Sequence, residues 1–163
     1  MTLKVSFDLD GTLFDWNNYY NSIFGQPKTD LEITKNVRKV KRSKDFWLNQ
    51  PVINRPDFTP FCYCTARINK KSLIKEQLSK NGFPKANVYQ VLGYSLSKAP
   101  QIKRSCADVH IDDSISVYKD LTSKGIPCLL IDAPHNRHFQ TKARIYSLSY
   151  KEIEETYNRL FNE

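Results

Sequence analysis

Two aspartates, Asp8 and Asp10, stand where a short apolar run ends, within the stretch VSFDLDGTLF at residues 5–14. The run before them is rich in residues that favour β-strands, and Gly11 follows where the chain must turn. Side chains two apart can point to opposite faces of an ideal strand, but at a strand end the turning backbone lets both carboxylates face one cavity. Paired carboxylates of this kind can bind a divalent cation or act as nucleophile and acid/base.

Three interpretations of this pair compete. A calcium loop of the EF-hand type requires an oxygen ligand, a glycine and a glutamate at set positions after the first aspartate. The chain has Thr12, Leu13 and Tyr19 at those positions, which excludes that loop. The aspartates could instead cap a turn and do no chemistry. The third interpretation, phosphoryl transfer to an aspartate nucleophile, requires partner residues elsewhere in the chain.

The length of 163 residues suits a single domain with a small insertion, and the hydrophobic fraction of 40% is sufficient for one core. No apolar run approaches the roughly 20 residues that span a bilayer, so we expect no membrane partner. Asp8 and Asp10 interrupt the apolar stretch near the N-terminus, which argues against a signal peptide. We therefore expect a cytoplasmic protein.

The charge and the cysteines bear on partners and compartment. The chain has 25 Lys and Arg against 17 Asp and Glu, a net charge of +8, which favours an anionic partner such as a phosphorylated small molecule or a nucleic acid. No two cysteines form a C-x-x-C pair, which disfavours zinc, and we expect buried free thiols in a reducing compartment. The cysteines are Cys62, Cys64, Cys106 and Cys128.

The segment from about residue 15 to residue 60 differs in character from the rest, and we predict that it is an insertion beside the core. A helix is expected over residues 31–41, with Thr29 or Asp30 as its N-cap. Residues 46–48 are apolar enough to pack the insertion on the core or to line a pocket. The segment also carries a basic run, which is either a solvated face or a lid that steers phosphate to a site. That run comprises Lys35, Arg38, Lys39, Lys41, Arg42 and Lys44.

Short strands and helices alternate after residue 60, with short connections between them. This alternation predicts right-handed βαβ units and thus an α/β fold, a Rossmann-like parallel sheet of about five strands flanked by helices. The predicted strands cover residues 5–7, 61–64, 88–92, 109–111 and 128–131, with a further short strand at 145–146, and the predicted helices cover residues 72–81, 100–106, 115–124 and 151–161.

Polar residues follow the ends of three predicted strands, and a lysine precedes one helix. In parallel sheets the ligand binds at the carboxyl ends of the strands. Because those ends share one edge of the sheet, we expect the four sets of residues to meet in one crevice. The sets are Asp8 with Asp10, Thr65, Lys98, and Asp112 with Asp113.

Phosphoryl transfer to a carboxylate requires an in-line nucleophile, an acid for the leaving group and positive charge around the phosphoryl oxygens. Asp8 is the predicted nucleophile, and Asp10 would protonate the leaving alcohol and later deprotonate the attacking water. A hard divalent cation, expected to be Mg²⁺, would lie between Asp8, Asp112 and the phosphate. The backbone carbonyl of Asp10 would be a further ligand, and Asp113 would hold a metal-bound water.

Thr65 and Lys98 complete this scheme. The Thr65 hydroxyl would donate to a phosphoryl oxygen, and the Lys98 ammonium would contact both the nucleophile and the phosphate. Taken alone, a strand-end threonine is more often a β-former and a lysine more often solvated. The histidines are not required: His110 fits a core position with one satisfied nitrogen, whereas His135 and His138 lie in a loop that could contact substrate.

D-L-D-G-T-L at residues 8–13, a strand that ends in Thr65, Lys98 and the Asp112–Asp113 pair resemble, in that order, the four motifs of the haloacid dehalogenase (HAD) superfamily. The resemblance implies a Rossmann-like fold in one domain over residues 1–163. It also implies that the insertion at about 15–60 is a small helical cap of the C1 type.

A narrower resemblance is to the 5′(3′)-deoxyribonucleotidases. It rests on the stretch from Lys98 to Asp113, on Thr65-Ala66-Arg67, and on the loop Pro134-x-Asn136-Arg137. That family implies Mg²⁺-dependent removal of phosphate from nucleoside monophosphates.

Three functions follow as hypotheses. The first is a Mg²⁺-dependent phosphatase, a 5′-nucleotidase that forms an aspartyl-phosphate. The second, motivated by the basic run, is a polynucleotide 3′-phosphatase similar to those of the same superfamily. The third is a catalytically silent module that binds nucleic acid, which the presence of every predicted catalytic carboxylate disfavours.

Overall fold

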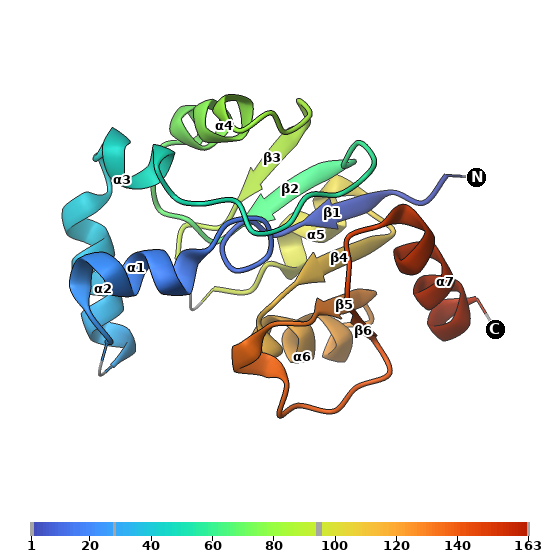
Figure 1. The fold of residues 1–163 in the computed structure, drawn as a ribbon. Coiled ribbons are helices and arrows are strands. Elements are labelled where there is room, and N and C mark those ends of the chain that lie inside the picture. The colour runs from blue at the N-terminus through green and yellow to red at the C-terminus, as the bar shows by residue number, and fades with distance from the viewer. Residues whose placement is uncertain (1, 28, 94–95, 163) are drawn as a thin grey trace.

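The computed structural model describes residues 2–27, 29–93 and 96–162, and shows an α/β fold built on a six-stranded sheet (Figure 1). Every strand pairs in parallel with its neighbours, in the order β3-β2-β1-β4-β5-β6. The predicted parallel sheet of an α/β fold is thereby confirmed, and it is compatible with a Rossmann-like fold. Its strands are β1 (Val5–Phe7), β2 (Cys62–Thr65), β3 (Asn87–Gln90), β4 (Val109–Asp112), β5 (Cys128–Ile131) and β6 (Arg144–Ile145).

The sheet has one strand more than the predicted count of about five, and the additional strand overlaps the further short strand predicted at 145–146. The sixth strand, β6, pairs with β5 through Leu130 with Arg144 and Ile131 with Ile145. It begins one residue before the short strand that the sequence indicates at 145–146. A two-residue strand with a charged first residue shows no hydrophobic period, so its pairing is decided by the neighbouring strand.

Helices cover both faces of the sheet (Figure 1). Alternate side chains of the strands divide between the two faces, as on β2, where Tyr63 packs with α4 and Cys64 packs with α5. Helices α4 and α7 share the larger core cluster, and α5 and α6 share the smaller one. Their bounds, which lie within one residue of the predicted ones, are α4 (Lys71–Lys80), α5 (Ala99–Ser105), α6 (Ile115–Ser123) and α7 (Tyr150–Phe161).

The 15–60 segment contains α1 (Trp16–Phe24), α2 (Asp30–Val40) and α3 (Lys44–Leu48), which gather at one end of the sheet (Figure 1). Helix α2 matches the prediction, and its N-cap Thr29 accepts from the backbone N–H of Glu32. Helix α1 has no counterpart among the predicted helices. Its Asn-rich start hides the i, i+4 spacing of its aromatic residues, and it is held by packing with α2 and α3. That this segment is an insertion stays a prediction.

Three of the four cysteines are buried free thiols, as expected, whereas Cys106 is exposed. Cys106 is the C-cap of α5 in a left-handed conformation, with φ 60°, and this places it where the helix ends at the surface. In the parts of the chain that the structure describes, no helix has the length and apolar character needed to cross a bilayer.

Candidate functional site

The turn after β1 places the first predicted site residue. The backbone N–H of Asp8 donates to the carbonyl of Ile111 at 2.9 Å, which extends the β1–β4 pairing to the point where both strands end. The chain then turns around the Leu9 carbonyl, which accepts from the N–H groups of residues 12–14. Gly11 permits this turn with φ 83°. Asp8 therefore emerges beside the end of β4.

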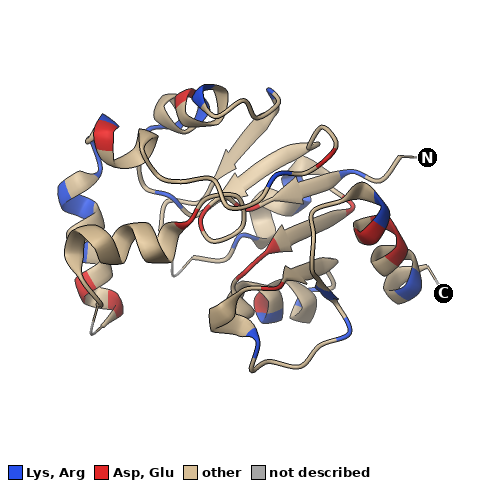
Figure 2. Cartoon of the chain, in the orientation of Figure 1, with Lys and Arg blue, Asp and Glu red and all other residues tan. Residues whose placement is uncertain are grey.

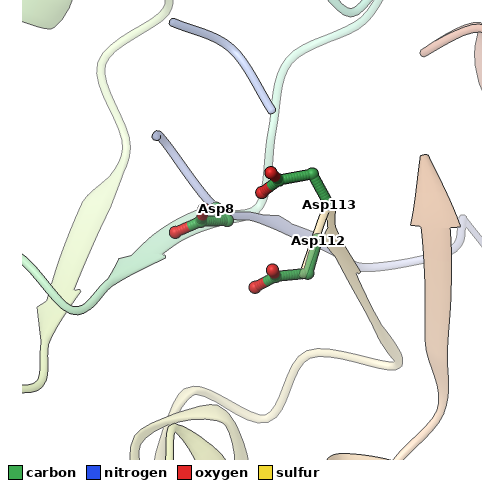
Figure 3. A group of neighbouring side chains, drawn as sticks. All are labelled: Asp8, Asp112 and Asp113. Atoms are coloured by element: carbon green, nitrogen blue, oxygen red, sulfur yellow. The ribbon is translucent and has the colours of Figure 1, made fainter. Parts of the chain in front are cut away.

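Asp8, Asp112 and Asp113 each place one carboxylate oxygen within 4.8 Å of the others, and all three are buried (Figure 3). Asp112 is the last residue of β4, and Asp113 follows it. Three oxygens at this separation form a donor set that suits a hard divalent cation such as Mg²⁺. The residues therefore fit the expected ion, because a cation there would relieve the repulsion among buried carboxylates.

Lys98, at the start of α5, contacts two of these carboxylates. Its Nζ lies 2.7 Å from Asp8 Oδ1 and 2.7 Å from Asp112 Oδ2, and the residue is only 4% exposed. Burial alone would lower the pKa of Lys98, but Asp112 and Asp8 together raise it above its ordinary value. The lysine is therefore a permanent cation between two acids.

The two acids that share Lys98 have opposite shifts. Burial raises the pKa of Asp8 well above its ordinary value, and the opposing effect of Lys98 is smaller. Burial also favours a raised pKa for Asp112, but Lys98 and a hydrogen bond from His110 outweigh it, so that pKa is lowered. Asp112 is thus the more firmly ionised of the pair.

His110 is buried, as predicted, but both ring nitrogens have partners instead of one. Nδ1 lies 3.0 Å from Ser6 Oγ, and Nε2 lies 3.1 Å from Asp112 Oδ2. Burial lowers the pKa of His110, so the ring is neutral at pH 7. A neutral ring that donates from Nε2 to Asp112 must accept from Ser6 at Nδ1. His110 consequently orients Asp112, a role that sequence reasoning missed because it depends on pairing between β1 and β4.

Asp113 is positioned by contacts with His135 and Thr12, which differ from those of Asp112. Burial raises the pKa of Asp113, although Nε2 of His135, 2.9 Å from Asp113 Oδ2, opposes that effect. The contact in turn raises the pKa of His135. Thr12 Oγ1 donates to Asp113 Oδ1 at 3.4 Å, and a Cβ on Gly11 would collide with the Asp113 carboxylate. His135 thus reaches the site through Asp113, whereas exposed His138 is not among the described residues that line the crevice.

Asp10 lines the same crevice, and its carboxylate is bound by Arg67 and Gln50. Oδ1 accepts from Arg67 Nη2 at 2.6 Å and from Gln50 Nε2 at 3.0 Å, and Oδ2 accepts from Arg67 Nε at 2.8 Å. The structure thus brings Asp8, Asp112, Asp113 and Lys98 together and holds Asp10 next to them by a separate contact.

Arg67 is a site residue whose role the sequence analysis missed. It is fully buried, its guanidinium also donates to side-chain oxygens of Gln50 and Gln77, and its carbon Cζ lies 5.0 Å from the Trp47 ring centre. Besides Asp10, its partners come from α4 and the 15–60 segment, so no local pattern identifies them. The available signals were its position two residues after Thr65 and its place in the Thr65-Ala66-Arg67 stretch of the narrower resemblance.

Thr65 ends β2 and is 1% exposed within the crevice lining. Its hydroxyl oxygen accepts from the backbone N–H of Arg67 at 3.3 Å. The hydroxyl donates to no other described residue, so its proton is available to an oxygen in the crevice. Thr65 thus lies in the crevice at the end of β2, and its role as a donor to phosphate stays a prediction.

The crevice has a volume of about 640 Å³, in the range of small-molecule sites. Its far wall comes from α2 and α1 and from the loop after β3. Of the six basic residues in the predicted lid, only Arg38 lines it. The larger apolar side chains of the wall are those of Trp16, Ile33, Val37, Ile68, Leu92, Leu96 and Val117.

The chain was also compared with known proteins. No family model matches it, and no curated protein matches it significantly.

Proposed function

We propose that this protein is a Mg²⁺-dependent phosphomonoester hydrolase of the haloacid dehalogenase type, with Asp8 as nucleophile. One observation carries the proposal: three buried carboxylates and a buried lysine converge at the carboxyl ends of β1 and β4. Structural ion pairs rarely concentrate three acids against one lysine, because the excess negative charge is costly to bury. A site that takes up a cation and a phosphate accounts for that cost.

Asp8, Asp112 and Asp113 would hold the Mg²⁺ ion, which would supply charge to offset the repulsion between phosphate and carboxylates. A free oxygen of Asp8 attacks phosphorus, so an Asp8–phosphorus bond forms as the ester bond breaks and the leaving alcohol takes a proton. Water then gives a proton to Asp10 as its oxygen bonds to phosphorus and the Asp8–phosphorus bond breaks, which regenerates the Asp8 carboxylate and releases inorganic phosphate. Lys98 orients Asp8 and Thr65 donates to a phosphoryl oxygen.

Asp10 is the proposed proton donor to the leaving alcohol. Both of its oxygens accept hydrogen bonds from Arg67, but Oδ2 accepts only one from the described residues, which leaves a lone pair of that oxygen to carry the proton. Arg67 and Gln50 therefore act as positioning residues that fix the direction from which Asp10 approaches.

The proposed substrate is a nucleoside monophosphate. The crevice volume of about 640 Å³ suits a molecule of that size, and its wall offers apolar side chains to a base and Arg38 to an anion. The resemblance to 5′(3′)-deoxyribonucleotidases supports the same class.

A panel of nucleoside monophosphates and sugar phosphates, with and without Mg²⁺, tests the proposal. We expect phosphate release that requires Mg²⁺ and that falls by about four orders of magnitude in Asp8→Asn, because nucleophiles contribute on that scale. Circular dichroism should show that the variant keeps its fold. Undiminished hydrolysis by Asp8→Asn would remove the mechanism, and no release from any ester would favour a silent binding module.

A further inference from the structure

Positive charge is concentrated in one short part of the chain. Residues 33–44 carry six cationic side chains and no acidic one, so the other 151 residues carry 19 cationic and 17 acidic side chains, a net charge of only +2. All six cationic side chains are exposed. We call them the basic surface; they are Lys35, Arg38, Lys39, Lys41, Arg42 and Lys44.

The basic surface begins at the edge of the crevice. Arg38 lines the crevice together with Asp8 and Lys98, and Lys35 is its neighbour one helical turn away on α2. Figure 2 shows cationic residues on α2 and in the connection to α3, whereas the first turn of α2 carries acidic Asp30 and Glu32. An anion that extends out of the crevice is therefore directed toward the C-terminal end of α2.

Intramolecular pairing accounts for little of this charge. Lys44, whose side chain is 68% exposed, lies 3.2 Å from Glu76, and this is the ion pair that the basic surface forms with the described residues. Cations in the last turn of α2 also interact favourably with the negative end of the helix dipole, which can explain Arg38 and Lys39. That effect fades within one turn, so it does not explain Lys35 or Lys44.

The pattern of the surface identifies the kind of partner. Closely spaced cations on an exposed helix and turn match a chain of repeated phosphates. An anionic membrane would also require a group of apolar anchors among the cations. Of the described large exposed apolar residues, α2 carries only Leu31, which lies in its acidic first turn between Asp30 and Glu32, and none falls between 32 and 50. The adjoining crevice, at about 640 Å³, has room for one nucleotide and not for a folded polymer.

We propose that the basic surface binds a single-stranded nucleic acid, whose terminal phosphate enters the crevice while the following phosphates contact the basic surface. The fate of that terminal phosphate rests on the proposed function. Binding of the strand itself does not, because it depends only on charge and on an open path from the crevice.

Fluorescence anisotropy tests the binding with a labelled single strand of about 12 nucleotides, a length within the usual range of single-strand sites. The protein is Asp8→Asn, so no turnover is needed. The test variant adds Lys39→Gln, Lys41→Gln and Arg42→Gln. The control variant instead adds Lys85→Gln, Lys103→Gln and Lys151→Gln, which are exposed elsewhere and remove the same charge.

We expect the test variant to raise the Kd at least about tenfold at 100 mM salt and to reduce the salt slope by about 2, since each phosphate contact contributes about 0.7. The control variant should change the Kd and the salt slope much less than the test variant does. Equal losses in the two variants, or tighter binding of the parent to phosphatidylserine vesicles than to the strand, would overturn the proposal.

A second measurement separates this inference from the catalytic one. In the active protein, the ratio of kcat/KM for a terminally phosphorylated strand to that for a nucleoside monophosphate should fall about tenfold in the test variant and stay constant in the control. Strand binding without hydrolysis of any phosphate would support the basic surface and overturn the proposed function. Hydrolysis of mononucleotides with no charge-dependent strand binding would support the proposed function and overturn strand binding by the basic surface.

Discussion

Lys98 is the cation that two of the three buried carboxylates share, and it determines how much negative charge the site tolerates. Its Nζ is equidistant, at 2.7 Å, from Asp8 and Asp112. Such a pairing is costly to break because the acids left behind remain buried.

Replacing Lys98 by Met should lower kcat/KM by at least about two orders of magnitude, because a cation that faces developing phosphoryl charge contributes on that scale. Without Mg²⁺ the variant should also lose about 3–5 kcal/mol of unfolding free energy. Phosphate release and urea unfolding measure the two effects. Lys103→Met, at an exposed position of the same helix, is the control. An unchanged rate would show that Lys98 has only a structural role.

Arg67 connects the acid Asp10 to two other parts of the chain. Its guanidinium donates two hydrogen bonds to the Asp10 carboxylate in a bidentate arrangement through Nε and Nη2. It also donates to Gln50 in the 15–60 segment and to Gln77 of α4. A lysine has one ammonium group and cannot reproduce such a bidentate arrangement.

We expect Arg67→Met to lower the unfolding free energy by about 3–5 kcal/mol, because Asp10 would lose its buried partner. Arg67→Lys should recover only part of this. In a double-mutant cycle with Asp10→Asn, monitored by urea unfolding, the coupling should exceed about 1 kcal/mol. Additive effects of the two substitutions would contradict a direct Arg67–Asp10 interaction.

At the scale of elements, the turn between β1 and the 15–60 segment must pass close to Asp113. Gly11 has φ 83°, and any Cβ there would overlap the Asp113 carboxylate. Gly25, at the end of α1, has φ 75°, but a Cβ added there would meet no described atom within 4 Å. A substitution at Gly25 therefore tests backbone strain alone, whereas one at Gly11 adds a steric clash with Asp113.

Gly25→Ala should cost about 1–3 kcal/mol of unfolding free energy through its positive-φ backbone alone. Gly11→Ala should cost more and should also weaken stabilisation by Mg²⁺, because it displaces Asp113. Urea unfolding with and without Mg²⁺ compares the pair. Equal costs, with the Mg²⁺ response intact in both, would contradict the close approach of Gly11 to Asp113.

At the scale of the whole molecule, buried acids and exposed bases occupy different places. Three buried carboxylates lie together and Lys98 pairs with two of them, so the interior of the site holds more acidic groups than cations. Burial raises the pKa values of Asp8 and Asp113. A raised pKa in the folded state contributes stability below the unfolded value of about 4, and that contribution is lost as pH rises through the folded pKa.

The protein without Mg²⁺ should therefore lose stability as pH rises above about 4, and Mg²⁺ should compensate most where Asp8 and Asp113 are ionised. We expect a larger Mg²⁺-induced rise in Tm at pH 7.5 than at pH 5, measured by differential scanning fluorimetry. The lowered pKa of Asp112 acts with the opposite sign, and its contribution is lost only as pH falls below about 4. An equal rise at both pH values would contradict the assignment of these acids to the cation site.

Local patterns in the sequence determined the sheet and most helices, because hydrophobic period, caps and turn residues act over a few positions. They also placed Asp8, Thr65 and Asp112 at strand ends, and parallel strands bring such ends to one edge. The fold class and the approach of Asp8, Lys98 and Asp112 were thus accessible from the sequence.

The tertiary structure alone decided which side chains meet across long separations. The partners of Asp10 and Asp112 are Arg67 and His110, and of the six basic residues only Arg38 reaches the crevice. The aromatic helix α1 also becomes recognisable only through its packing with α2 and α3. Such contacts depend on how elements distant in the chain pack and on which face of a helix is covered, and no local pattern records either.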